Sequence, residues 1–83
     1  MHAQAMRSQP EREDVRFQSA LLGLVLCEHP TELTAEDLRR ELGDPDATDR
    51  AIDELVVVGL LRRAEEAVIP TRAALRFDLL EAK

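Results

Sequence analysis

Apolar residues recur at helical spacing from about Asp14 to Glu28 and predict the first helix of the chain. This helix should end at His29, because the residue before a proline disfavours the helical conformation. Its apolar side chains form two neighbouring stripes, Phe17, Leu21 and Leu24 on one and Leu22, Val25 and Leu26 on the other. Together the stripes are wider than one packed face requires. The helix is therefore either central to the fold or partly covered by another subunit.

A capping motif marks the start of a second, shorter helix. Thr34 is a typical N-cap residue, and Asp37 three positions later completes an approximate capping box, with Asp in place of the usual Glu. Leu38 and Leu42 lie four residues apart and are predicted to face inward. Gly43 suits the C-terminal cap of this helix, because glycine readily adopts the left-handed conformation found there.

A third helix is predicted from its cap, Asp44, to about Val58. Pro45 suits the first helical position, where the missing N–H removes no hydrogen bond, and Gly59 ends the helix. The side chains expected to face the core recur at helical spacing: Thr48, Ala51, Ile52, Leu55 and Val58.

The pattern after Gly59 is typical of a short β-hairpin followed by a helix. Residues 60–63 and 68–70 predict the two strands and 64–67 the turn, and Pro70 suits an edge position because it cannot donate to a ladder. Residues 31–33 are a candidate for a small additional strand. Thr71 is expected to cap a fourth helix that reaches about Glu81.

The fourth helix carries apolar residues on two faces. Ala74, Phe77 and Leu80 form the stripe expected to pack on the domain, while Leu75 and Leu79 form a second one. Two interpretations stay open. Either the helix lies between the first helix and the hairpin and buries both stripes, or the surplus residues form a two-fold dimer contact. The interface candidates in the second case are Leu21, Leu24, Leu75 and Leu79.

The order of these elements resembles the winged helix-turn-helix fold of bacterial transcription regulators. The resemblance covers roughly residues 15–82 and is carried by three stretches, LTAEDLRRELG, AIDELVVVGLL and VIPTRAALRF. It implies a mostly α domain of the α+β class over 14–83, with a three-helix helix-turn-helix core, a two- or three-stranded β-hairpin wing and an additional C-terminal helix. The polar, non-periodic segment 1–13 is expected to be a disordered N-terminal tail.

The resemblance also implies a way of binding duplex DNA, with the third helix in the major groove and the wing on the neighbouring backbone. The basic candidates for this contact are Arg39, Arg40, Arg50, Arg62 and Arg63. Arg62 and Arg63 cannot both face DNA, because adjacent strand residues point to opposite sides. Arg40 can instead pair with Glu36, and Arg50 with Asp46 or Glu54, on their own helices.

Acidic side chains oppose this interpretation. The outer face of the third helix carries one cation, Arg50, against four acids, Asp46, Asp49, Asp53 and Glu54. The wing tip is also acidic, since it is Glu65-Glu66. The chain of 83 residues has a net charge of −6, which repels a duplex at long range. Carboxylates can accept a hydrogen bond from cytosine, but only as single contacts beside cations.

The residue inventory argues against several other classes. Cys27 is the sole cysteine, so neither an intrachain disulfide nor a thiolate metal cluster can form. His2 and His29 belong to no catalytic or metal-binding motif, and there is no glycine-rich phosphate loop. We expect no enzyme and no cofactor or metal. No apolar run is long enough to cross a membrane and no signal peptide is recognisable, so the expected compartment is the cytoplasm.

Two functions of different classes remain open. The first is a small DNA-binding transcription regulator that acts as a homodimer; a chain this small buries only ~60 % of its unfolded surface, so a second subunit would help. The second is a winged-helix protein-interaction module that does not bind DNA. Its interface would include Asp49 and Asp53, facing a basic partner protein.

Overall fold

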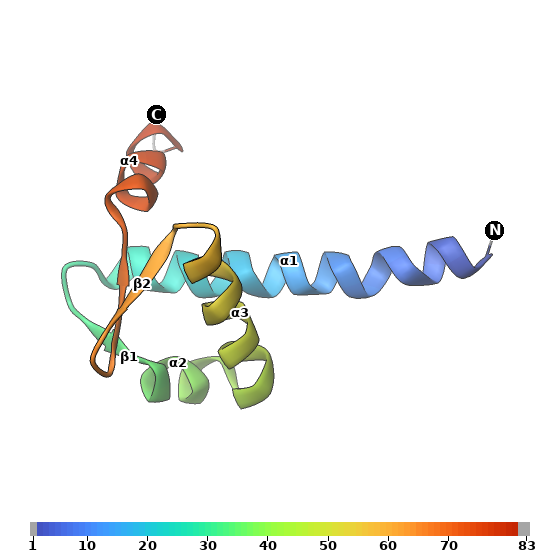
Figure 1. The fold of residues 1–83 in the computed structure, drawn as a ribbon, viewed down its shortest axis with the longest axis horizontal. Coiled ribbons are helices and arrows are strands. Elements are labelled where there is room, and N and C mark those ends of the chain that lie inside the picture. Colours follow the sequence, from blue (N-terminus) through green and yellow to red (C-terminus); the bar gives the residue numbers. More distant parts are fainter. Residues whose placement is uncertain (1, 82–83) are drawn as a thin grey trace.

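Four helices and a small antiparallel sheet form the part of the chain that the structure describes. This computed structural model describes the backbone of residues 2–81 and the side chains of residues 14–80, so residue 1 of the predicted tail and residues 82–83 of the predicted domain lie outside it. The elements are α1 (His2–Glu28), β1 (Leu33–Thr34), α2 (Ala35–Leu42), α3 (Pro45–Val57), β2 (Leu61–Ala64), β3 (Ala67–Pro70) and α4 (Arg72–Glu81). Figure 1 shows α2 and α4 near opposite ends of the sheet, with α3 crossing α1.

The sheet has the strand order β1-β3-β2, so the return strand of the hairpin is its central strand. β3 is thus not an edge strand along its whole length, but Pro70 at its end keeps the predicted edge position. Because β1 has only two residues, paired with Ala67 and Val68, Pro70 lies beyond it and faces a partner residue only on β2, where it is opposite Leu61. The first strand is also displaced slightly from the predicted 31–33, since it comprises Leu33 and Thr34.

The helix caps agree with the predictions. The Thr34 hydroxyl accepts a hydrogen bond from the Asp37 N–H, and the Asp37 carboxylate accepts one from the Thr34 N–H, each at 3.0 Å. Gly43 ends α2 with a left-handed φ of 77°. The Asp44 carboxylate accepts from the Ala47 N–H at 3.1 Å, and Pro45 opens α3. These local bonds satisfy backbone groups that a helix end leaves without partners.

The capping box also changes the acidity of its carboxylate. The Thr34 backbone N–H is the largest cause that holds the pKa of Asp37 below its ordinary value. The Thr34 hydroxyl acts in the same direction, and so does the positive charge of Arg40. Ionised Asp37 is therefore favoured by the folded state.

Asp37→Asn is expected to reduce the loss of stability that acid causes. Because the folded-state pKa of Asp37 is lowered, its contribution is fully present above the ordinary Asp value of ~3.9 and disappears as the pH falls through the lowered value. Urea unfolding at pH 7 and at about pH 3 measures this loss. The control Glu41→Gln removes a carboxylate from the same helix without touching the capping box. Equal losses in the wild-type and Asp37→Asn proteins would contradict the prediction.

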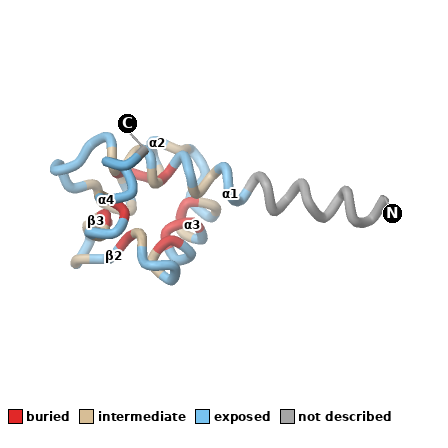
Figure 2. The backbone as a smooth tube through the Cα atoms, turned by 90° about the horizontal axis from the view of Figure 1, so that it is seen from above, coloured by how far each residue is buried: buried red, intermediate tan, exposed pale blue. Residues whose placement is uncertain are grey.

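One core joins α1, α2, α3 and the sheet, and Figure 2 shows its buried segments facing the interior. Its buried members are Leu21, Val25, Leu38, Ala51, Ile52, Leu55, Leu61 and Val68. The predicted buried face of α3 is confirmed except for Val58, which is 63 % exposed because α3 ends before it and the chain turns at Gly59.

Leu21 is corrected from a candidate interface residue to a core residue, because it is fully buried within this chain. Leu24 is partly buried against the same core. The width of the apolar surface on α1 is thus explained by its central position, where it contacts α3, β3 and α4. A second subunit is not needed to cover these two leucines.

α4 is less covered than its predicted core stripe requires. Ala74 is buried, but Phe77 and Leu80 are 61 % and 67 % exposed, so the expectation that they pack on the domain is wrong. Leu75 is half-buried and Leu79 is 69 % exposed. The physical reason is that, among the described residues, the main contacts of α4 with the body are those with α1 and β3. The interpretation in which α4 buries both stripes in its own chain therefore fails.

The start of α1 also differs from the prediction. The backbone of residues 2–13 continues α1 as a helix, so α1 begins earlier than the predicted start at about Asp14. This segment contains residues of high helix propensity, such as Ala3, Gln4 and Ala5. Extending a formed helix costs much less than nucleating a new one, so a stable α1 favours this continuation.

Candidate nucleic-acid interface

α3 presents the face that sequence reasoning assigned to DNA. The opposite side of α3 is buried in the core. The five charged residues predicted on the outer face lie at the surface, where Asp49 is half-buried and the other four are exposed: Asp46, Arg50, Asp53 and Glu54. This placement follows from helical spacing alone. Two of these side chains, Asp49 and Asp53, bind arginines on neighbouring elements.

Asp49 binds an arginine of α2. The Nε of Arg39 donates to the Asp49 carboxylate at 2.9 Å, with 39 % of the arginine side chain and 47 % of the aspartate side chain exposed. The helix-turn-helix arrangement brings these two residues together, ten positions apart in sequence. Arg39 was a candidate DNA contact and Asp49 a candidate protein contact, and here they neutralise each other.

Asp53 makes an equivalent ion pair with the wing. The Arg63 guanidinium donates to the Asp53 carboxylate at 2.6 Å, and both side chains are substantially exposed. Arg63 lies opposite the buried Val68, which places it on the sheet face toward α3, whereas Arg62 lies opposite Ile69 on the other face. The predicted division of Arg62 and Arg63 between two faces is thus confirmed.

Arg40 is the third candidate arginine with an acidic partner. Its guanidinium donates to the Asp37 carboxylate at 3.2 Å, three residues away on α2, instead of to the expected Glu36. Asp37 is held in place by the capping box, which makes it the better positioned acceptor. Both side chains are exposed to solvent, so this pair is weak.

Arg50 and Arg62 differ from the other three candidates. Both are exposed, and among residues 14–80 neither makes an ion pair, so the expected pairing of Arg50 with Asp46 or Glu54 is not found. Two arginines, one on α3 and one on the wing, therefore keep a guanidinium available for an external anion. The wing tip is acidic as expected, with Glu65 in a left-handed conformation at φ 59°.

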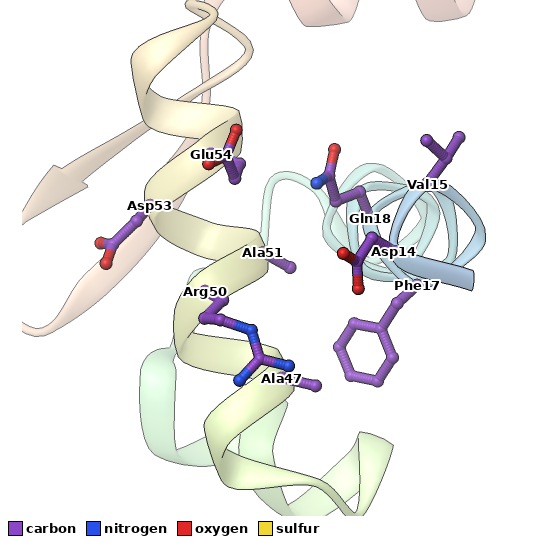
Figure 3. A pocket seen from close by; sticks show the side chains of 9 residues that line it. All are labelled: Asp14, Val15, Phe17, Gln18, Ala47, Arg50, Ala51, Asp53 and Glu54. Carbon is purple, nitrogen blue, oxygen red and sulfur yellow. The ribbon is translucent and has the colours of Figure 1, made fainter. Parts of the chain in front are cut away.

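A groove of about 600 Å³ lies between α1 and α3. In Figure 3, Ala47 and Ala51 point from α3 toward α1, where Phe17 lies, while Asp53 points to the other side of α3. Sequence reasoning did not predict this groove, because its walls come from two helices about thirty residues apart. Acids outnumber the single cation among its lining residues, Asp14, Val15, Phe17, Gln18, Ala47, Arg50, Ala51, Asp53 and Glu54.

The described residues hold no group of three or more His, Cys, Asp or Glu side chains arranged to bind a metal ion. Within the described part, none of the helices has the length and apolar character needed to cross a membrane. Cys27 is an exposed free thiol. The charged groups at the α2–α3–wing surface are thus guanidinium and carboxylate groups.

The element order, the three-stranded sheet and the α2–turn–α3 arrangement define a winged helix-turn-helix domain. The fold is similar to that of MepR, a transcription regulator of the Staphylococcus aureus multidrug efflux pump MepA. The TM-score is 0.66 over 99 % of this chain and 80 % of that chain, at 15 % sequence identity. No protein-family model and no curated protein matches the sequence.

Proposed function

We propose that this chain is a small cytoplasmic transcription regulator that binds duplex DNA as a homodimer and carries out no catalysis. The observation that carries the proposal is a pair of exposed arginines, Arg50 on α3 and Arg62 on β2, that have no acidic partner among residues 14–80, in a winged helix whose fold is similar to that of a transcription regulator. The domain is taken as residues 14–83. In this fold, α3 enters the major groove and the wing lies on the adjacent backbone.

The homodimer is supported by the uncovered face of α4. Phe77, Leu79 and Leu80 are large apolar residues that solvent would otherwise contact, and they lie within a single ten-residue helix. Apolar patches of this kind mark interaction surfaces. A two-fold dimer buries the same patch of both subunits and places two copies of α3 for neighbouring half-sites.

DNA affinity should be modest and should fall as salt rises. Arg50 and Arg62 provide about four phosphate contacts in a dimer, so the affinity for random duplex fragments should fall roughly 10²-fold between 50 and 200 mM salt. Arg50→Ala removes two of the four contacts and should weaken binding about tenfold at the lower salt. A fluorescence-anisotropy titration measures both effects. Glu65→Ala at the wing tip is the control and should retain wild-type affinity.

A second candidate function is a winged-helix module that binds a basic protein instead of DNA. The acids on α3 and at the wing tip favour it, because Asp46 and Glu54 are exposed and, among the described residues, have no arginine partner. In that case the wild-type protein should show no salt-dependent DNA affinity. Charge reversal of Asp49 and Asp53 should then disrupt a protein complex recovered from cells.

A further inference from the structure

We propose that Asp49 and Asp53 are internal competitors for DNA phosphate, which hold Arg39 and Arg63 until a duplex displaces them. This inference rests on the proposed function. It assigns a role to acids on α3 that otherwise seem only to oppose DNA binding. Two of the four acids are joined to arginines on the elements that flank α3, one on α2 and one on β2.

The geometry allows exchange of partners. Both ion pairs are short, at 2.9 and 2.6 Å, yet all four side chains keep between 39 % and 70 % of their surface exposed. An incoming phosphate can therefore reach either guanidinium without unfolding the domain. Exposed ion pairs contribute little net stability, so their exchange for a phosphate contact leaves the core that positions α3 unchanged.

The two pairs also lie on the surface that a duplex would approach. Asp53 points away from α1 (Figure 3), and its carboxylate binds the wing arginine Arg63. Asp49 lies one helical turn earlier on α3 and binds α2. The pairs are therefore arranged along the outer face of α3, on the path of the DNA backbone expected for this fold.

An internal counter-ion has a measurable consequence. When an arginine neutralises a phosphate, the cation condensed on the DNA there is released, and the affinity becomes dependent on salt. Arg39 and Arg63 are neutralised by carboxylates of the same chain, which after displacement remain attached, repel the phosphate and attract a cation in place of the one released. The wild-type salt dependence should thus reflect Arg50 and Arg62 almost alone, although α2, α3 and the wing carry five candidate arginines.

The test is Asp49→Asn/Asp53→Asn, which preserves the shape of both side chains and removes their charge. Random duplex DNA is titrated at several salt concentrations between 50 and 200 mM. Arg39 should become available, while Arg62 and Arg63, on opposite faces of the sheet, supply one wing contact between them, so the slope of log affinity against log salt should steepen by about 1.8 for a dimer. The affinity at 50 mM should rise at least tenfold. Circular dichroism checks that each variant remains folded.

A matched control separates partner release from a general change in charge. Asp46→Asn/Glu54→Gln removes the same two charges from the same helix, but from acids that make no ion pair among the described residues. It should strengthen binding less and leave the slope near the wild-type value. A control that steepens the slope as much as Asp49→Asn/Asp53→Asn overturns the inference, as does an unchanged slope in the latter variant.

Arginine removal completes the experiment. Arg39→Ala/Arg63→Ala should weaken DNA binding in the wild-type background, because Asp49 and Asp53 then lose the arginines that neutralise them, and should cancel the gain in the Asp49→Asn/Asp53→Asn background. Elution from a heparin column supplies a readout that does not depend on DNA. Asp49→Asn/Asp53→Asn should require more salt for elution than the control Asp46→Asn/Glu54→Gln. If the wild-type protein does not bind DNA but Asp49→Asn/Asp53→Asn elutes at higher salt than its control, the proposed function is rejected and the internal competition is retained. Wild-type binding with equal elution of the two variants would reject only the competition.

Discussion

Leu38→Ala is expected to destabilise the protein by about 2–5 kcal/mol, the range for removal of a fully buried leucine side chain. Leu38 is fully buried and is the only buried residue of α2. Its loss leaves a cavity between α2 and the rest of the core. Because small domains are stable by only about 5–15 kcal/mol, this single change should remove a large share of the total.

Urea unfolding monitored by circular dichroism measures the effect. Leu42→Ala is the matched control, because Leu42 lies one turn later on α2 but is only partly buried against the core. Leu42→Ala should reduce the free energy of unfolding clearly less than Leu38→Ala. If Leu38→Ala costs less than about 1 kcal/mol, below the range for a buried leucine, then α2 is not attached to the core as the structure describes.

Phe77→Ser/Leu80→Ser is expected to convert a homodimer to monomers. The two residues lie three positions apart on α4, and both are more than half exposed. Truncation of a central interface residue typically costs 2 kcal/mol or more, which corresponds to roughly a 30-fold increase in the dissociation constant. The stability of the monomer should change little, because neither residue belongs to the core cluster.

Sedimentation velocity over a range of protein concentrations measures this change. Val57→Ser is the control, since Val57 is 82 % exposed on α3 and lies outside α4. It should leave the dimer intact. A wild-type protein that remains monomeric at about 100 μM would reject the dimer, since interfaces of nanomolar to micromolar affinity are saturated at that concentration.

Local signals explain why most of the fold could be predicted. Thr34, Gly43, Asp44 and Thr71 each act on backbone groups within a few residues, and each occupies the predicted cap in the structure. The buried face of α3 likewise follows from helical spacing. The prediction of which residues are buried failed where burial depends on elements distant in sequence. Leu21 is covered because other elements pack around α1, and Phe77 is exposed because no other described element covers it.

The candidate site divides in the same way. Helical spacing correctly predicted that the four acids and Arg50 lie at the surface of α3. It did not show that Asp49 and Asp53 hold Arg39 and Arg63, because spacing rules apply within one helix and these pairs join different elements. The pairing changes the functional interpretation, since the number of arginines near α3 overstates the number available to a phosphate.

The amino-acid sequence by itself determined the order of helices and strands, the caps between them and the acidic character of α3, because these depend on near neighbours and composition. The tertiary structure alone decided three further properties: the central place of α1, the uncovered side of α4 and the partners of the arginines. Each of them depends on which surfaces meet after the chain has folded. Contacts between residues far apart in sequence leave no periodic signal, so only the packed structure specifies them.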